Sequence, residues 1–130
     1  MSAIGGSVVM VAAVAGTASA ATPRNGVCEV GEFCLYWGPD RTGSLSDFNG
    51  SIPDYGSIQP TCYDFKGAGQ GQGVCVKDKA TSAWNRTTAN TVTVYYHINY
   101  GNPSDVFAPG QAGNLNNTYL HNESHRFVHN

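Results

Sequence analysis

The sequence predicts an all-β fold built from two similar units, and three observations support this class. Segments 35–43 and 94–102 each run from a hydrophobic stretch through an aromatic pair into a turn that contains Gly or Asn. Elsewhere apolar residues alternate with polar ones, which is the pattern of half-buried strands. Gly-Pro, Asn-Gly, Pro-Gly and Gly-Asn pairs interrupt these stretches at the spacing of sandwiches and barrels.

The strands are expected where β-branched and aromatic residues cluster. The strongest candidate is 91–97, in which Thr and Val alternate, and 33–37 is the next. No window of a dozen residues has the pattern of an amphipathic helix, and the glycine-rich stretch 67–73 is expected to be a loop. Shorter strands are predicted at 45–48, 62–65, 73–76, 82–85, 106–108 and 124–128.

Length and charge limit the function classes. A chain of 130 residues that is 41% hydrophobic and 12% charged fits a single folded domain. Its seven basic and nine acidic residues are scattered, so no basic stripe could neutralise successive phosphates. Nucleic acid is therefore not an expected partner.

The first twenty residues have the form of a secretory signal peptide. They carry no charge, and an apolar stretch at 4–15 leads to the small-residue ending Ala18-Ser19-Ala20. A retained membrane anchor is disfavoured because this stretch is short and rich in Gly and Ala. We expect residues 1–20 to be removed and residues 21–130 to form one extracellular domain, monomeric and free of the membrane.

An even number of cysteines in an exported chain predicts disulfides. Three pairings are open, and we favour Cys28 with Cys34 and Cys62 with Cys75, because each pair brackets a short segment that contains Gly. A tetrathiolate zinc site is disfavoured because no C-x-x-C pair is present. The sequence also lacks a G-x-S-x-G elbow, an HExxH motif or a placed pair of carboxylates, so we do not expect an enzyme.

The two related segments resemble the βγ-crystallin Greek-key motif, aromatic-x4-aromatic-x-Gly. This motif needs a residue with positive φ, which Gly supplies most easily and Asn next. Both copies are imperfect, since Arg41 stands where the first copy should have its second aromatic and Asn102 replaces the glycine of the second. The residues assigned to the motif are Tyr36, Gly43, Tyr95, Tyr100 and Asn102.

A wider resemblance covers most of the chain after residue 20. The pieces that carry it are 28–36, Ala83-Trp84-Asn85, 94–96, Ala108-Pro109-Gly110, Asn114-Leu115 and 124–127. Together they are similar to the Streptomyces metalloproteinase-inhibitor family, whose fold is of the βγ-crystallin type. The resemblance implies a β-sandwich of two Greek keys and a secreted inhibitor of extracellular proteases, with a thermolysin-like metalloprotease as the partner.

Inhibition of such a protease requires a hydrophobic side chain on a loop too rigid to leave after cleavage. The hypothesis from the sequence is the segment Cys75-Val76-Lys77, with Val76 inserted, the Cys62–Cys75 disulfide as a brace and Lys77 as a polar contact. The family's inhibitory member similarly places a Cys-Val dipeptide in a small disulfide loop. The alternative is that Val74 and Val76 are alternate residues of an ordinary strand.

A secreted binding module for calcium, cell wall or carbohydrate is the alternative function. No cofactor is expected, although calcium stays open at Asn116-Asn117 or 54–57, loops that supply few carboxylates. The aromatic residues are expected to lie mainly in the core rather than on a carbohydrate platform. Three histidines, His121, His125 and His129, recur every four residues, and we expect them to be solvated rather than to bind a metal.

Overall fold

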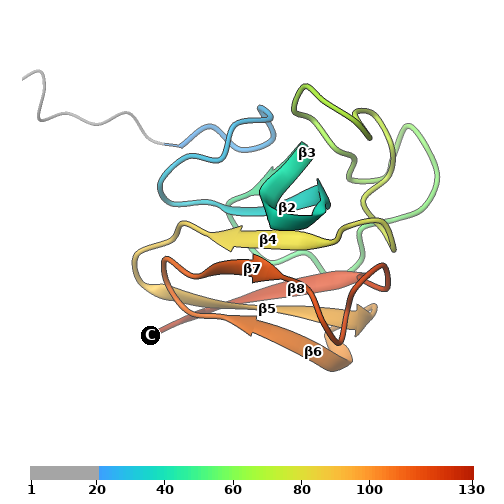
Figure 1. Cartoon of the computed structure of the whole chain (residues 1–130). Coiled ribbons are helices and arrows are strands. Elements are labelled where there is room, and N and C mark those ends of the chain that lie inside the picture. The colour runs from blue at the N-terminus through green and yellow to red at the C-terminus, as the bar shows by residue number, and fades with distance from the viewer. Residues whose placement is uncertain (1–20) are drawn as a thin grey trace, which may run out of the picture.

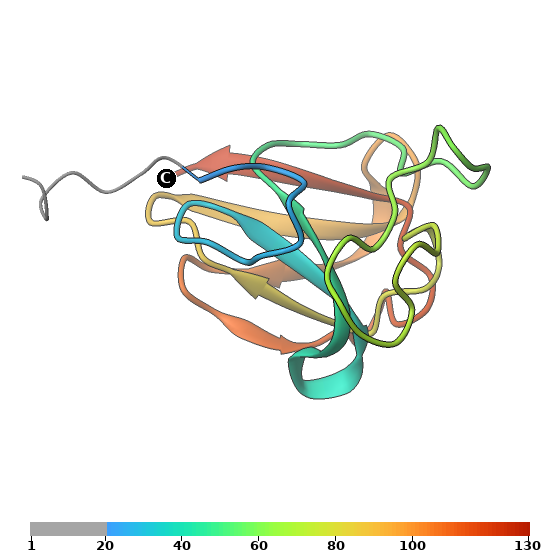
Figure 2. The same cartoon turned by 90° about the horizontal axis from the view of Figure 1, so that it is seen from above.

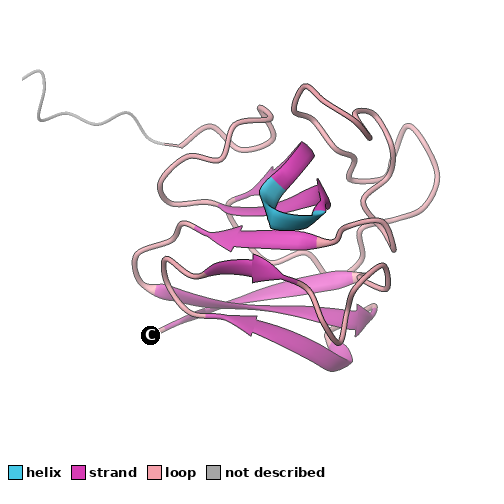
Figure 3. Ribbon diagram, viewed as in Figure 1, coloured by secondary structure: helices cyan, strands magenta, loops and turns pink. Residues whose placement is uncertain are grey.

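The computed structural model describes residues 21–130, which form two antiparallel β-sheets packed face to face (Figure 1). The predicted signal peptide lies outside the described residues. One sheet has the order β3-β2-β4-β7 and the other β6-β5-β8. In Figure 3 the strands are stacked and the longest loops gather above them and to the right. The elements are β2 (Phe33–Gly38), the 3-10 turn η1 (Pro39–Arg41), β3 (Thr42–Phe48), β4 (Ser82–Asn85), β5 (Asn90–His97), β6 (Gly101–Phe107), β7 (Ala112–Asn114) and β8 (Ser124–His129).

The chain forms two Greek-key units, and the third strand of each unit pairs with the sheet of the other unit. β7 follows β6 in the chain but pairs with β4 in the opposite sheet. In the first unit the third strand is reduced to Ile52, whose amide and carbonyl both bond His125 of β8 at 3.0 Å. The predicted all-β, two-Greek-key sandwich is therefore confirmed.

The two hairpins predicted from the repeat fold in the same way. β2 pairs with β3 and β5 pairs with β6, and each pairing shifts register at the end of the first strand. Two consecutive residues with positive φ make each turn, and such residues are uncommon outside glycine. They occupy equivalent positions in the two copies: Asp40 and Arg41 in the first, Asn99 and Tyr100 in the second.

The structure corrects the role predicted for Asn102. Gly43 has φ of 75° as expected, whereas Asn102 is not among the residues with positive φ. The physical reason is Pro103, because the ring of a proline forces the preceding residue into extended conformations. The second copy therefore follows a different path immediately after its turn.

Arg41 fits the motif because the first unit has its cation in the turn and its aromatic residue on the fourth strand, which is the reverse of the second unit. Its guanidinium lies 4.6 Å from the ring centroid of Trp84, the third residue of β4. In the second unit the cation is Arg126, on the equivalent strand β8, and it lies 5.2 Å from the ring of Tyr100. A stacked cation–aromatic pair is thus kept in both halves.

A serine at the start of the fourth strand closes each hairpin. The Ser82 hydroxyl donates to the Gly38 carbonyl (2.7 Å) and accepts from the Arg41 amide (2.9 Å). The Ser124 hydroxyl does the same with the His97 carbonyl (2.7 Å) and the Tyr100 amide (3.1 Å). Both serines are fully buried, so these backbone groups have no access to water as a substitute partner.

Replacing Ser124 by alanine is expected to lower the free energy of unfolding by about 1 to 3 kcal/mol, because a carbonyl and an amide lose their partner. Urea denaturation measures the change. Ser104→Ala is the matched control, since the Ser104 hydroxyl makes no hydrogen bond within residues 21–130, and it is expected to change stability by less than about 0.5 kcal/mol. Equal effects of the two substitutions would contradict this role.

The core between the sheets contains His125, which the sequence analysis expected in solvent. The prediction is wrong for this histidine, which has no exposed surface. Its ring packs against Phe33 and Phe48, with ring centroids 5.2 and 4.6 Å away. Its nitrogens bond the Tyr55 hydroxyl and the Gly50 carbonyl, both at 2.8 Å, so Nε2 carries the proton and Nδ1 accepts. Burial lowers the pKa of His125 to about 3.

Candidate functional site

The structure does not support Val76 as an inserted side chain. Val76 has no exposed surface and belongs to the hydrophobic core, and its amide donates to the Tyr63 carbonyl at 2.8 Å. The strand-like alternation that the sequence analysis kept as the alternative explains this, because Val74 points outward and is 37% exposed. Val76 is unable to enter a protease while this core is intact.

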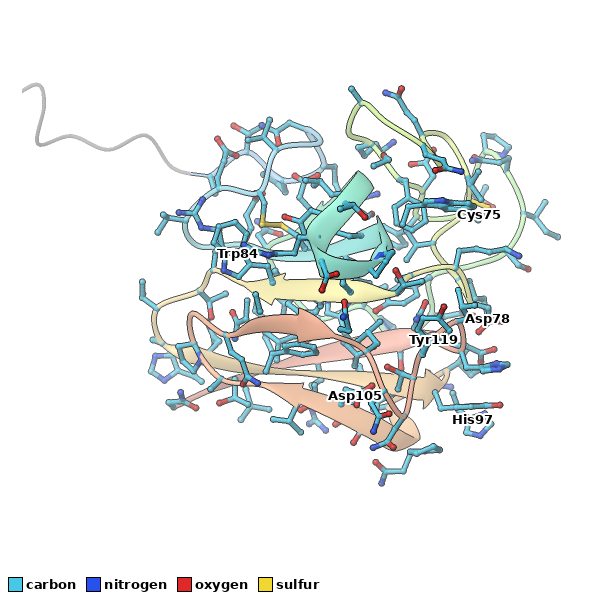
Figure 4. The ribbon with its side chains drawn as sticks, in the orientation of Figure 1. Cys75, Asp78, Trp84, His97, Asp105 and Tyr119 are labelled. Atoms are coloured by element: carbon cyan, nitrogen blue, oxygen red, sulfur yellow. A yellow bond between two sulfur atoms is a disulfide. The ribbon has the colours of Figure 1, made fainter. Side chains whose placement is uncertain are left out.

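Both disulfides have the pairing that the sequence analysis favoured. Cys28 is bonded to Cys34 and Cys62 to Cys75. The Cys62–Cys75 bond joins two parts of the long connection between β3 and β4. In Figure 4, Cys75 lies on the right side of the molecule with Asp78, while Trp84 lies on the left. The disulfide that was expected to brace an inhibitory loop is therefore present, but Val76 is buried and does not lie on an exposed loop.

An exposed hydrophobic residue does lie close to this disulfide in the chain, at Ile58, whose carbonyl accepts a hydrogen bond from the Cys62 amide at 3.0 Å. It is 72% exposed, the largest fraction among the exposed large hydrophobic residues within 21–130. We call residues 54–62 the tethered loop, since they end at Cys62. In Figure 2 the green segment close to residue 60 projects from the right side of the molecule. Sequence reasoning missed Ile58, although a lone isoleucine in a polar, proline-containing turn before a cysteine was a readable signal.

The chain after Ile58 is held in a tight turn. Its carbonyl accepts hydrogen bonds from the Thr61 amide (3.1 Å), the Cys62 amide (3.0 Å) and the Thr61 hydroxyl (2.9 Å). The side-chain amide of Gln59 donates to the Gly73 carbonyl at 2.6 Å, across the disulfide loop. The turn is thus fixed both to itself and to the segment that Cys75 anchors.

The chain before Ile58 is fixed by Tyr55, which has no exposed surface. The Tyr55 amide donates to the Glu123 carbonyl (3.0 Å), and its own carbonyl accepts from the Tyr63 amide (2.8 Å). Its ring stacks on Phe48 and its hydroxyl bonds buried His125. Tyr55 therefore anchors the tethered loop to the core three residues before Ile58.

Between the two anchors the backbone is open. Within residues 21–130 no group hydrogen-bonds the Ser57 amide or carbonyl or the Ile58 amide. Gly56 directs the chain outward with φ of 79°, and a Cβ there would lie 3.2 Å from the Cα of Cys62, so a larger residue would be strained. The peptide bond between Ser57 and Ile58 is consequently presented to solvent in a fixed position.

Lys77, the polar contact of the original hypothesis, supports the start of the tethered loop instead. Its Nζ lies 3.2 Å from the Asp54 carboxylate. The same carboxylate accepts from the Gly56 amide at 2.9 Å. The Gly56 hydrogen bond is the main cause that holds the pKa of Asp54 below its usual value, and Lys77 adds to it. Asp54 therefore stays ionised and holds both groups at neutral pH.

The described residues offer no obvious cation cage. Among residues 21–130, no group of three or more His, Cys, Asp and Glu side chains is placed to hold a metal ion. At Asn116-Asn117 the backbone amides donate to the Asp105 carboxylate, both at 3.1 Å. The sequence analysis left calcium open at these loops, and calcium binding stays untested. No helix in the part of the chain that the structure describes is long and apolar enough to cross a membrane.

The paired hairpins, the exchanged third strands and the closing serines define a βγ-crystallin-type domain. Solved structures agree. One, described as "Evolution of the eye lens beta-gamma-crystallin domain fold", is similar over 88% of this chain and 95% of its own, with a TM-score of 0.56 and 10% identity. The N-terminal domain of protein S is similar over 75% of this chain and 96% of its own, with a TM-score of 0.51 and 13% identity.

At these identities the likeness shows the fold alone, and the family comes from the sequence. The model of peptidase inhibitor family I36 matches residues 21–107. The chain belongs to this family, as the resemblance indicated, and the family consists of protease inhibitors rather than enzymes. No protein among the curated sequences matches the chain significantly.

Proposed function

We propose that this protein is a secreted inhibitor of extracellular metalloproteases, and that it presents the Ser57–Ile58 peptide bond of the tethered loop to the protease. The observation that carries the proposal is a 72% exposed isoleucine on a loop fixed on both sides. Membership of an inhibitor family supports the general activity. The two disulfides and the resemblance to exported inhibitors support secretion.

The hydrogen bonds around Ile58 favour the bond before it over the bond after it. A protease attacks a carbonyl carbon and stabilises the oxygen as it becomes negative. The Ile58 carbonyl already accepts three hydrogen bonds and faces the turn. The Ser57 carbonyl has no partner within residues 21–130 and is free to meet the protease. Ile58 is then the first residue on the leaving side.

This orientation supports a particular class of target. Thermolysin-like proteases bind a hydrophobic side chain directly after the bond they cleave, and Ile58 would occupy that pocket. The Ser57 amide and carbonyl and the Ile58 amide, which have no partner within residues 21–130, can pair with an extended strand of the protease, which adds affinity through the backbone. Because the loop is fixed before binding, little conformational entropy is lost on association.

The two anchors also oppose release after cleavage. If the Ser57–Ile58 bond is cut, Tyr55 holds the new carboxyl end close to the core, and the turn bonded to the Ile58 carbonyl holds the new amine. Two reacting groups kept this close have a very high effective concentration. Resynthesis of the bond therefore competes with departure of the fragments, and the protease stays occupied.

Ile58→Asp is expected to weaken inhibition of a thermolysin-type protease by about 100-fold or more, because an unpaired carboxylate would enter a hydrophobic pocket. The measurement is residual protease activity against inhibitor concentration, with the purified protein in titration. Ile58→Leu is expected to keep inhibition within about tenfold, since it preserves the buried apolar area.

Val106→Asp is the matched control, because Val106 is also an exposed branched residue (57%) but lies on β6, away from the tethered loop. It is expected to leave inhibition unchanged. Thermal unfolding of all three variants separates a local effect from loss of the fold. Full inhibition by a folded Ile58→Asp protein would rule out the proposed bond.

A further inference from the structure

Two carboxyl side chains are buried together under the first residues that the structure describes. Glu32, just before β2, and Asp47, in β3, both have no exposed surface. Asp47 pairs with Cys34, two residues after Glu32, and the Glu32 and Asp47 carboxyl groups are close enough for each charge to act on the other. We call residues 21–29 the N-terminal arm, since three of its backbone amides bond these two side chains.

Three of the four carboxyl oxygens of the pair accept a hydrogen bond from an amide of the arm. The Asp47 carboxylate accepts from the amides of Asn25 (2.9 Å) and Gly26 (2.8 Å), one on each oxygen. The Glu32 Oε1 atom accepts from the Glu29 amide at 2.9 Å. The Glu32 Oε2 atom is buried and has no hydrogen-bond partner within residues 21–130.

An ionised carboxylate can only accept hydrogen bonds, so two ionised groups in contact would repel each other. A single proton on Glu32 Oε2, donated to Asp47, removes the repulsion and satisfies the unpaired atom. Glu32 is its expected carrier because two amides already stabilise Asp47 in the ionised form. Burial is the main cause that raises the pKa of Glu32 to about 7, and Asp47 adds to it.

The other charges that face the pair do not replace this proton. Glu29 is negative and adds to the repulsion. Arg24 is a cation whose charge acts on both carboxyl groups, but its guanidinium is bound to the Ser46 hydroxyl (2.7 Å) and the carbonyls of Asp47 and Asp64 (both 2.8 Å). It also lies over the rings of Phe48 and Tyr63, 4.5 and 5.3 Å from their centroids.

Arg24 connects the arm to the tethered loop. Its guanidinium bonds Asp64, two residues after Cys62, and the Asp64 carboxylate accepts from the Gln59 side chain at 3.4 Å. Arg24 is thus part of the support under the turn that holds Ile58. An arm that leaves its place removes this support.

We propose that Glu32 and Asp47 share one proton that holds the N-terminal arm closed, and that loss of this proton toward neutral pH opens the arm and loosens the tethered loop. The first half stands on the buried pair alone, and the effect on inhibition rests on the proposed function. No bond other than that of the proton changes, and the proton passes from Glu32 to water.

The direction of the pH dependence follows from the difference in the pKa of Glu32 between the closed and the open arm. In the closed arm Glu32 titrates near pH 7, whereas in the open arm water reaches it and it returns to its ordinary value of about 4.5. The closed arm is therefore fully favoured below pH 4.5, and opening releases one proton between pH 4.5 and 7. Over this range the opening equilibrium rises up to tenfold per pH unit, and above pH 7 it is constant.

Hydrogen exchange of the peptide that covers residues 21–29 tests the first half on the free protein, without a protease. After correction for the intrinsic pH dependence of exchange, protection of the Asn25 and Gly26 amides is expected to fall about tenfold per pH unit between pH 5 and 7 and then level off. In Glu32→Gln the amide donates to Asp47 as the proton does, so protection is expected to be high and independent of pH.

Glu29→Gln is the matched control, because it removes a charge from the same arm outside the buried pair, and it is expected to keep the pH dependence. A wild-type profile that is flat between pH 5 and 7, or a folded Glu32→Gln protein with the wild-type slope, overturns the proposal. If Glu32→Gln does not fold, NMR titration of the wild-type Glu32 carboxyl decides, since a midpoint near pH 4.5 instead of 7 also overturns it.

The second half is tested by the ratio of inhibition constants for wild type and Glu32→Gln against one protease, which cancels the protease's own pH dependence. Wild type is expected to become progressively weaker than the variant from pH 5 to 7. If this ratio stays constant with pH while protection of the arm depends on pH, opening of the arm does not loosen the tethered loop, and the second half of the proposal is wrong. Absence of inhibition by either protein contradicts the proposed function and leaves the exchange result intact.

Discussion

Replacing Cys62 and Cys75 together by alanine is expected to turn the inhibitor into a substrate and to lower the free energy of unfolding by about 3 kcal/mol. The disulfide closes a segment of 13 residues, and its loss enlarges the unfolded ensemble. It also frees the turn after Ile58, so that the new amine end can leave after cleavage. Urea denaturation measures the first effect, and protease activity over time measures the second.

Removal of Cys28 and Cys34 is the control for this result. That disulfide spans only 6 residues and lies outside the tethered loop, so the expected loss of stability is about 2 kcal/mol. The variant is expected to keep inhibiting at temperatures where it is folded and at pH 5, where the shared proton holds the N-terminal arm closed. If this variant became the substrate and the Cys62–Cys75 variant remained a lasting inhibitor, the bracing role would be contradicted.

The second large effect is a dependence of the free energy of unfolding on pH, and it is caused by the buried His125. The pKa of His125 is lowered to about 3 in the folded protein, so the unfolded chain binds a proton that the folded one does not. Stability from neutral His125 is therefore complete above pH 6.5 and is lost as the pH falls toward 3. The slope is about 1.4 kcal/mol per pH unit over that range.

Comparison with His125→Gln isolates this contribution from the carboxyl groups, including Glu32. Above pH 6.5 the variant is expected to be less stable than wild type by about 2 to 4 kcal/mol, since it leaves a cavity and weakens bonds to Tyr55 and Gly50. The difference is expected to shrink steadily as the pH falls to 4. His129→Gln, an exposed histidine on the same strand, is expected to show no such trend, and a constant difference for His125→Gln would contradict the account.

Much of the fold was readable because it depends on local patterns. The repeat at Tyr36 and Tyr95 predicted both hairpins, since an aromatic strand followed by a tight turn needs only neighbouring residues. Arg41 appeared as a defect because its partner Trp84 is 43 positions further along the chain. The exchanged cation and aromatic become visible only when the strands are placed side by side.

The candidate site was predicted less well, for physical reasons that Val76 and Ile58 illustrate. Both are hydrophobic residues close in sequence to a cysteine of the same disulfide, since Val76 follows Cys75 directly and Ile58 precedes Cys62 by four residues. Which of them is buried depends on the path of the chain between Tyr55 and Tyr63, and that path is fixed by hydrogen bonds to distant carbonyls such as that of Glu123. His125 was misplaced for a similar reason, because its partners Tyr55 and Gly50 lie on a loop far away in sequence.

The most direct test of the central claim is to map the bond that the target protease cuts. The protein is incubated with an equimolar thermolysin-type protease, quenched in acid and examined by mass spectrometry. We expect one cut, between Ser57 and Ile58, and two fragments that separate under denaturing conditions without reduction, because neither disulfide spans this bond. Inhibition accompanied by a first cut elsewhere, such as within the glycine-rich stretch 67–73, would contradict the account.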